Sequence, residues 1–165
     1  MSDYCVIVTG GAYARFFTLE PVEFPELESG PRLIDRGELF NPEKEIAERD
    51  LYTDSKMGRG RAPLGGPAHG YDDHRSKHDN EFDRRFARKV LKRASGIAQD
   101  NKARYVVLVT PAHMLGLLRQ ELDIIRKGGM KVHILAKDMT KFSSKKIHNH
   151  LAKVKVLPPQ KRPGT

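Results

Sequence analysis

Histidine and aspartate side chains gather in one short stretch, between residues 69 and 79. Imidazole and carboxylate groups are ligands for Zn, Mn and similar ions, so a metal-dependent hydrolase or nuclease is one hypothesis. The spacing matches no metal-binding signature, and metal sites usually need ligands on a rigid scaffold. A polar, solvated loop is therefore the favoured interpretation, and we expect no cofactor. The candidate ligands are His69, Asp72, Asp73, His74 and His78.

These residues belong to a longer segment, 54–79, in which glycine, proline and basic residues interrupt any apolar periodicity. A loop of this length inside a domain is usually functional or disordered. Lysine and arginine neutralise phosphates, and glycine lets backbone amides approach them closely. We therefore predict a flexible loop that contacts RNA. Its basic candidates are Lys56, Arg59, Arg61, Arg75 and Lys77, and its backbone candidates are Gly58, Gly60, Gly65 and Gly66.

A second set of cations lies on the helix predicted over residues 79–99, where apolar residues recur at helical spacing. The opposite side of this helix is almost entirely basic. Such a run is often no more than a solvated face, but its lack of interleaved acids makes it a second candidate RNA-binding surface. The candidates are Arg84, Arg85, Arg88, Lys89 and Lys92.

The overall charge supports an acidic partner. The 165 residues carry a net charge of +9, with a pI near 9.7, as is common for nucleic-acid-binding proteins. Residues 1–50 hold five Lys/Arg and eleven Asp/Glu, a net of −6, whereas residues 137–165 hold eight against one, a net of +7. This asymmetry is typical of an acidic flank beside a polyanion-binding face, although a generally basic surface would give the same total.

The remaining composition favours a cytoplasmic protein. Cys5 has no partner for an internal disulfide, and its apolar surroundings predict a buried, structural thiol. The N-terminus lacks the basic and apolar regions of a signal peptide, and no stretch is long and apolar enough to span a membrane. No nucleophile–base pair is evident, so we expect a binding module rather than an enzyme.

The order of elements predicts an α/β fold with a mixed sheet. The first half reads as an antiparallel meander of three strands, with a short helix before the long loop. The second half alternates helix, strand, helix, strand and helix, and such crossovers force parallel strand pairs. The predicted strands are residues 4–9, 12–19, 32–40, 104–110, 130–136 and a short 153–157. The predicted helices are 42–50, 79–99, one starting at Pro111 and ending near Lys127, and one capped by Ser143 or Ser144. Residues 1–157 form one domain, and 158–165 form a loose basic tail.

Several motifs occur in a characteristic order along this chain. They are Cys-Val-Ile-Val-Thr-Gly-Gly-Ala-Tyr-Ala-Arg-Phe-Phe (5–17), Met-Gly-Arg (57–59), Phe86-Ala87, Thr-Pro-Ala-His-Met-Leu-Gly-Leu-Leu-Arg (110–119), and Ala-Lys-Asp-Met-Thr (136–140) followed by His150-Leu151. Together they resemble the bacterial host-attachment family. That family is similar in turn to the middle domain of archaeal and eukaryotic peptide-release factors.

The resemblance implies a ribonuclease H-like fold, a single release-factor-middle-domain-like domain and a role at the ribosome, in translation. Release factors carry Gly-Gly-Gln at the loop tip, whereas this chain has Gly65-Gly66-Pro67. Proline has neither the side-chain amide nor the backbone N–H that would position a water, so we do not expect peptidyl-tRNA hydrolysis. The family name also suggests an attachment-related protein as an alternative. A homodimer is compatible with the exposed sheet edge of such a fold.

Overall fold

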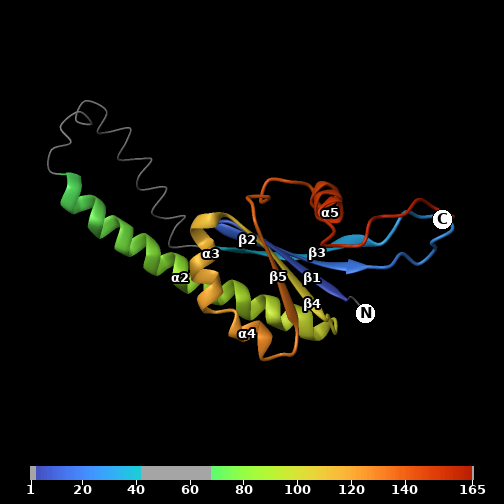
Figure 1. Ribbon diagram of the computed structural model, residues 1–165, viewed down its shortest axis with the longest axis horizontal. Helices are drawn as coiled ribbons and strands as arrows, with labels where there is room; N and C mark the ends of the chain where they lie inside the picture. Colours follow the sequence, from blue (N-terminus) through green and yellow to red (C-terminus); the bar gives the residue numbers. More distant parts are fainter. Residues whose placement is uncertain (1–2, 42–67, 165) are drawn as a thin grey trace.

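The computed structural model describes residues 3–41 and 68–164, with side chains in the long helix described from Glu81 onward except Phe82. Five strands form one mixed sheet in the order β3-β2-β1-β4-β5 (Figure 1). The first three pair antiparallel, and β1, β4 and β5 run parallel. The strands are β1 (Tyr4–Thr9), β2 (Tyr13–Glu20), β3 (Arg32–Phe40), β4 (Tyr105–Thr110) and β5 (Lys131–Ala136). The predicted α/β fold with a mixed sheet is confirmed.

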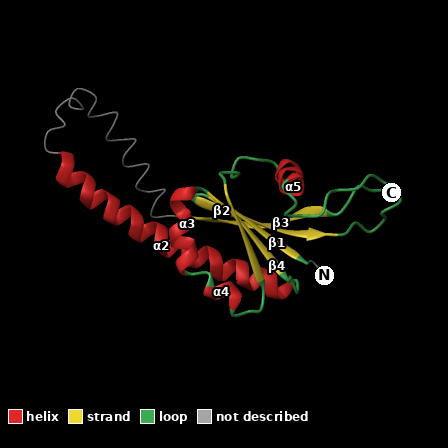
Figure 2. Cartoon of the chain, in the orientation of Figure 1, coloured by secondary structure: helices red, strands yellow, loops and turns green. Residues whose placement is uncertain are grey.

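Helices cover both faces of this sheet (Figure 2). One face packs against α2 (Ala68–Asp100), α3 (Ala112–Gln120) and α4 (Asp123–Arg126), and the other against α5 (Ser144–Lys153). Because β1 and β4 lie between the two layers, their side chains are buried on both sides. Their continuous apolar runs are the pattern expected for such central strands. No helix in the described part of the chain is long and apolar enough to cross a bilayer.

The alternation of side chains along β1 separates the two halves of the core. Cys5 and Ile7 pack with the α2 layer, whereas Val6 and Val8 pack with the α5 layer. Cys5 is fully buried, as predicted, and burial raises the pKa of its thiol to about 12. The thiol is therefore protonated and unreactive at neutral pH.

The long helix begins earlier than the sequence predicts. α2 starts at Ala68, so residues 68–79 are helical, and the prediction of a loop across them is wrong. No proline follows Pro67 in this stretch, and the one glycine, Gly70, costs a helix only about 1 kcal/mol relative to alanine. The predicted loop over 54–67 and the predicted helix over 42–50 lie outside the described residues.

The single helix predicted after Pro111 is in fact two, α3 and α4. The N–H of Glu121 donates to Leu118 O at 3.1 Å, and that of Leu122 to Arg119 O at 3.4 Å, which tightens the turn between them. The tightened turn leaves Leu122 in the core, with 2% of its surface exposed.

The C-terminal segment also differs from the prediction. Residues 153–157 form no strand, because Lys155 adopts a positive φ of 64° and the N–H groups of Val156 and Leu157 turn back to Leu151 O. Residues 158–164 are not a loose tail. Lys161 forms an antiparallel bridge with Gly30, which fixes this segment beside the start of β3.

Candidate nucleic-acid interface

The predicted basic face of α2 is exposed but partly neutralised. Arg84, Arg85, Arg88, Lys89 and Lys92 all reach solvent. Arg85 Nη2 lies 2.9 Å from Glu81 Oε1, one turn earlier on the same helix. Arg88 Nη2 lies 3.0 Å from Glu121 Oε1, at the end of α3. Two of the five predicted cations therefore already have carboxylate partners.

The other predicted site residues fall elsewhere. Lys56, Arg59, Arg61 and the four candidate glycines Gly58, Gly60, Gly65 and Gly66 lie outside the described residues. Arg75, Lys77 and the candidate metal ligands His69, Asp72, Asp73, His74 and His78 belong to the first turns of α2, where side chains are not described. Among the side chains that are described, no group of three or more His, Cys, Asp or Glu could hold a metal ion.

A second basic surface surrounds α5 and has no counterpart among the predicted sites. α5 begins with a cap in which Ser143 Oγ accepts from the N–H of Lys146 at 3.1 Å. Its apolar side, with Ile147 and Leu151, is fully buried against the sheet. The opposite side is therefore left to basic residues. We call the basic residues around this helix the α5 patch; it comprises the exposed Lys137, Lys141, Lys145, Lys146 and Lys153 and the half-buried His150.

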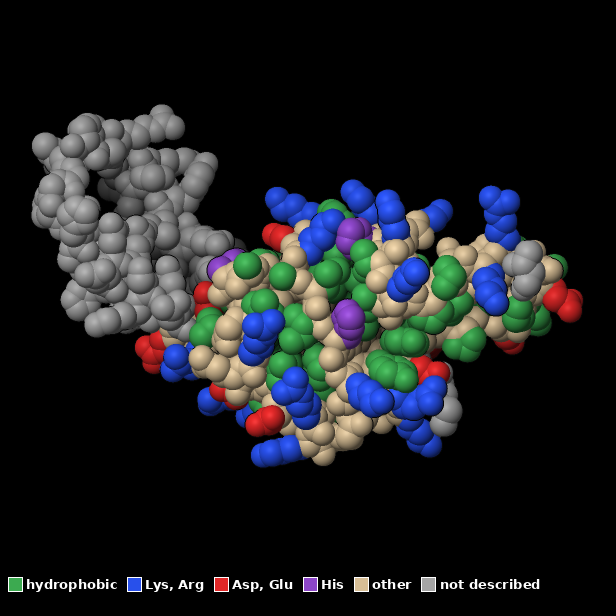
Figure 3. Space-filling view, viewed as in Figure 1, with side chains coloured by type: hydrophobic (Ala, Val, Ile, Leu, Met, Phe, Trp, Pro, Cys, Tyr) green, Lys and Arg blue, Asp and Glu red, His purple; other side chains and the backbone are tan. Residues whose placement is uncertain are grey.

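Lysine and arginine side chains gather along the upper edge of the molecule, where α5 lies (Figure 3). Lys137 Nζ lies 3.5 Å from His150 Nε2, and the ammonium of Lys146 lies 4.2 Å from the centroid of the Phe142 ring. Burial lowers the pKa of His150, and the positive charges of Lys137 and Lys153 lower it further. No ion pair among the described residues includes a lysine of the α5 patch.

The loop beneath the patch is held by two residues of β2. Thr140 O accepts from the hydroxyl of Tyr13 and, at 3.2 Å, from Arg15 Nη1, which also donates to Phe142 O. Within the loop, Asp138 Oδ1 accepts from the hydroxyl and the N–H of Thr140, at 2.7 and 3.1 Å. These two bonds lower the pKa of Asp138. The motifs at 5–17 and 136–140 are thus brought together by Arg15, and both support the α5 patch.

The distribution of acids in the sequence already indicates the α5 patch. No Asp or Glu follows Asp138, so every cation beyond it lacks an acid nearby in the chain. The charge of the C-terminal region predicts a basic surface. The predicted helix, short strand and loose tail would place its lysines on three separate elements. The structure instead gathers its lysines on one side of α5.

A polar cavity of about 360 Å³ adjoins the patch at Lys145. Arg32, Lys145 and His148 contribute to its walls together with serine and glutamine side chains, and no carboxylate lines it. His148 is 3% exposed, and its Nε2 lies 2.8 Å from Pro158 O. This cavity continues the positive surface from α5 toward the start of β3.

Comparisons with known proteins identify one family. A family model described as "Protein required for attachment to host cells" matches residues 5–151. No curated protein and no solved structure matches the chain.

Proposed function

The chain belongs to the family of proteins described as required for attachment to host cells, and we propose that it binds RNA through the α5 patch. The match contains all the motifs on which the resemblance rested, so the predicted family is confirmed. The observation that carries the proposal is the set of five patch lysines with no ion-pair partner among the described residues. Each lysine that contacts a phosphate releases a condensed counterion, which favours binding.

The burial of α5 favours a polyanion over a membrane surface. A helix that lies on a bilayer turns its apolar side toward the lipid. Ile147 and Leu151, the apolar side of α5, are instead fully buried against the sheet. Among the described residues near the patch, Val154 at the end of the helix and Phe40, which stacks on Tyr13, are large exposed apolar residues. The surface that α5 itself offers to a partner is mainly cationic.

The strand order β3-β2-β1-β4-β5, with three antiparallel strands followed by parallel ones, supports a ribonuclease H-like fold. A relation to release factors and a role at the ribosome belong to this proposal. Peptidyl-tRNA hydrolysis does not, because Pro67 stands where the release-factor loop has glutamine. The cytoplasmic location and the homodimer also stay predictions.

The family description supports a second candidate function. An attachment-related protein would meet acidic polysaccharides at a cell surface, and the same patch would bind them through charge. The two functions differ in the partner that binds more tightly, so they can be separated by direct comparison.

The test is fluorescence anisotropy of a labelled single-stranded RNA oligonucleotide, with heparin and anionic lipid vesicles as separate partners. We expect the logarithm of the RNA association constant to fall with the logarithm of salt concentration, with a slope of about −3 if roughly four phosphates are neutralised. Co-sedimentation with ribosomes should show the same salt sensitivity. Binding of heparin without RNA would overturn the proposal and favour the attachment-related function, and binding of vesicles alone would overturn both.

A further inference from the structure

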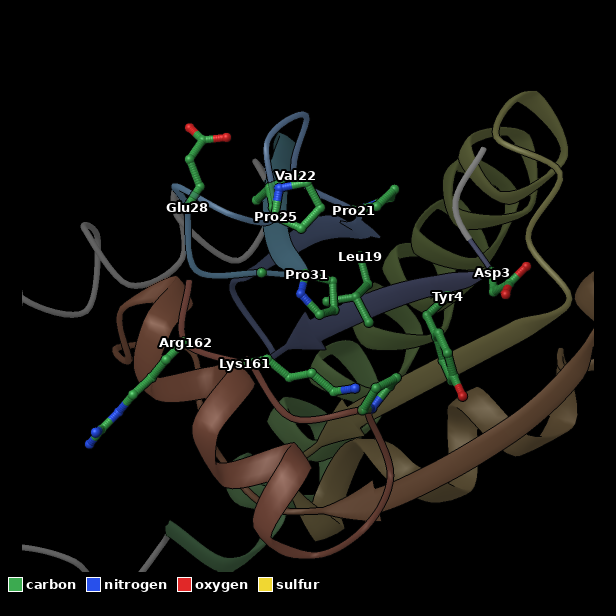
Figure 4. Close-up of a pocket in the computed structure, with 12 residues that line it drawn as sticks. Asp3, Tyr4, Leu19, Pro21, Val22, Pro25, Glu28, Pro31, Lys161 and Arg162 are labelled. Carbon is green, nitrogen blue, oxygen red and sulfur yellow. The ribbon is translucent and has the colours of Figure 1, made fainter. Parts of the chain in front are cut away.

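A second cavity, of about 400 Å³, lies at the other end of the sheet, between the start of β1, the segment after β2 and the C-terminal segment (Figure 4). This volume is within the usual range for small-molecule sites. The cavity is separate from the α5 patch, and nothing in the family description assigns a role to it. Its far wall includes Pro158 and Lys161, which lie beyond the residues matched by the family model.

The walls of this cavity are apolar and stiff. Four prolines line it, and their rings fix the backbone around the opening: Pro21, Pro25, Pro31 and Pro158. Leu19 closes it from the sheet side and is 5% exposed. Tyr4 is held by stacking on Tyr105, with ring centroids 5.1 Å apart. A cavity with such walls is already formed before a ligand enters, which reduces the entropic cost of binding.

A backbone bridge fixes the position of Lys161. Its N–H donates to Gly30 O at 2.8 Å, and the N–H of Gly30 donates to Lys161 O at 3.2 Å. A Cβ at position 30 would lie 2.7 Å from Cγ1 of Val22, so a larger residue there would force the Val22 side chain to shift. The two backbone hydrogen bonds to Gly30 hold Lys161 beside the cavity.

The charges around the cavity leave one ammonium group for a ligand. Asp3 pairs with Arg104, with Oδ2 and Nη2 3.1 Å apart, so its charge is compensated. In Figure 4 the side chain of Glu28 points away from the other lining residues, as does that of Arg162, whereas Lys161 extends beneath Leu19 toward Tyr4. Among the described residues, no carboxylate lies within ion-pair distance of the Lys161 ammonium.

We propose that this cavity binds a small apolar carboxylate, with its hydrocarbon body against the prolines and its carboxylate on the ammonium of Lys161. An apolar wall with one cation favours a ligand with a hydrocarbon body and one anionic end. Burial of the hydrocarbon against the wall stabilises the complex, and the cation orients the anionic end. The proposal does not depend on RNA binding, since no residue of the α5 patch lines the cavity.

The experiment compares 4-phenylbutyrate with 4-phenylbutanol, which share an apolar body and differ in charge. Each is titrated into the full-length ¹⁵N-labelled protein while amide shifts are followed by NMR. We expect shifts centred on the amides of Leu19, Gly30 and Lys161, and a Kd for the acid near 1 mM, because ligands of about a dozen non-hydrogen atoms reach roughly that affinity. The acid should bind about five- to tenfold more tightly than the alcohol.

Two variants separate the ammonium from the general charge of the region. Lys161→Met keeps most of the apolar stem and the backbone bridge but removes the cation, so affinity for the acid should fall about five- to tenfold and that for the alcohol should stay unchanged. Lys131→Met removes the same charge from an exposed residue at the same end of the sheet that does not line the cavity, and it should change neither affinity. Equal affinities for acid and alcohol in the native protein would overturn the proposal, as would shifts confined to other regions or no shifts at about ten times the expected Kd.

Discussion

The outer side of α2 and the α5 patch are both exposed and basic, and they lie on opposite faces of the same sheet. They differ in where the acids are. On α2, Glu81 comes from the helix itself and Glu121 from the end of α3, and each binds an arginine. From residue 137 onward, Asp138 is the one Asp or Glu of the sequence, and its Oδ1 accepts from Thr140. The other acids near α5 are on β3, which carries Asp35 and Glu38.

This difference shows that a count of cations does not locate a polyanion-binding surface. Exposed ion pairs contribute little to stability, typically about 0–1 kcal/mol, but they occupy cations that a phosphate would otherwise contact. Arg85 and Arg88 can contact an RNA only by exchanging a carboxylate for a phosphate. The lysines of the α5 patch need no such exchange, so the stronger binding should be there.

The largest expected effect, on both stability and RNA affinity, follows from removing Arg15, which holds the loop beneath the α5 patch. Arg15→Met removes the donor to Thr140 O and Phe142 O and leaves both carbonyl groups with fewer partners. Unfolding free energy should fall by about 2–3 kcal/mol, as for hydrogen bonds to a charged group, and RNA affinity should fall because the loop bearing Lys141 loosens. Urea denaturation and RNA anisotropy measure the two effects.

The matched control for that variant is on α2. Arg88→Met breaks a pair in which the Arg88 side chain is 53% exposed, so its stability loss should stay below about 1 kcal/mol. Equal losses for the two variants would contradict the supporting role of Arg15.

An intermediate effect should follow from removing the acids of the α2 face. Glu81→Gln with Glu121→Gln releases Arg85 and Arg88 from these partners, and RNA affinity should rise about two- to fivefold as two charges become available. The control is Glu23→Gln with Glu26→Gln, which changes the net charge equally in an exposed segment before β3. A rise of the same size in both double variants would show that total charge alone determines affinity.

The smallest expected effect is a pH dependence confined to the α5 patch. Burial, Lys137 and Lys153 lower the pKa of His150 in the folded protein below its ordinary value of 6.5. A bound phosphate favours the imidazolium, so RNA affinity should rise about twofold as pH falls from about 7.5 to about 6. His150→Gln should abolish this change.

The same shift has a consequence for the free protein. Between the folded and unfolded pKa values the unfolded chain binds more protons at His150, so this residue lowers stability as pH falls through about 6.5 toward the folded value. Urea midpoints for the native protein and His150→Gln should therefore differ by a constant amount above that window, and the difference should change within it. Parallel curves throughout would show that His150 keeps its ordinary pKa.

The sheet was predictable from sequence because its signals are local. Residues 4–9 and 105–110 are continuous apolar runs, and a strand buried on both faces requires that composition. The start of α2 was missed because Gly70 and the polar residues around it suggested a loop, although nothing after Pro67 prevents a helix. The backbone bridge between Gly30 and Lys161 joins residues more than a hundred positions apart, so no local sequence pattern predicts it.

The candidate site was predictable only in part. The exposure of Arg85 and Arg88 followed from helical periodicity, but the pairing of Arg88 with Glu121 depends on how α3 packs against α2. The α5 patch required knowing which side of a short helix faces the sheet. Ile147 and Leu151 indicated that side. The lysines of α5 form one surface with Lys137 and Lys141 only because Arg15 holds the 137–142 loop beside the helix.

The most direct test of the central claim compares two triple variants of equal charge. One is Lys145→Gln/Lys146→Gln/Lys153→Gln on α5, and the other is Arg84→Gln/Lys89→Gln/Lys92→Gln on α2. The RNA association constant of each is measured by anisotropy across a range of salt concentrations. The α5 variant should lose about 2 units of the salt slope and at least tenfold in affinity at low salt, whereas the α2 variant should stay within about 0.5 unit and threefold of the native protein. Equal losses in both variants, or a larger loss on α2, would contradict the assignment of RNA binding to the α5 patch.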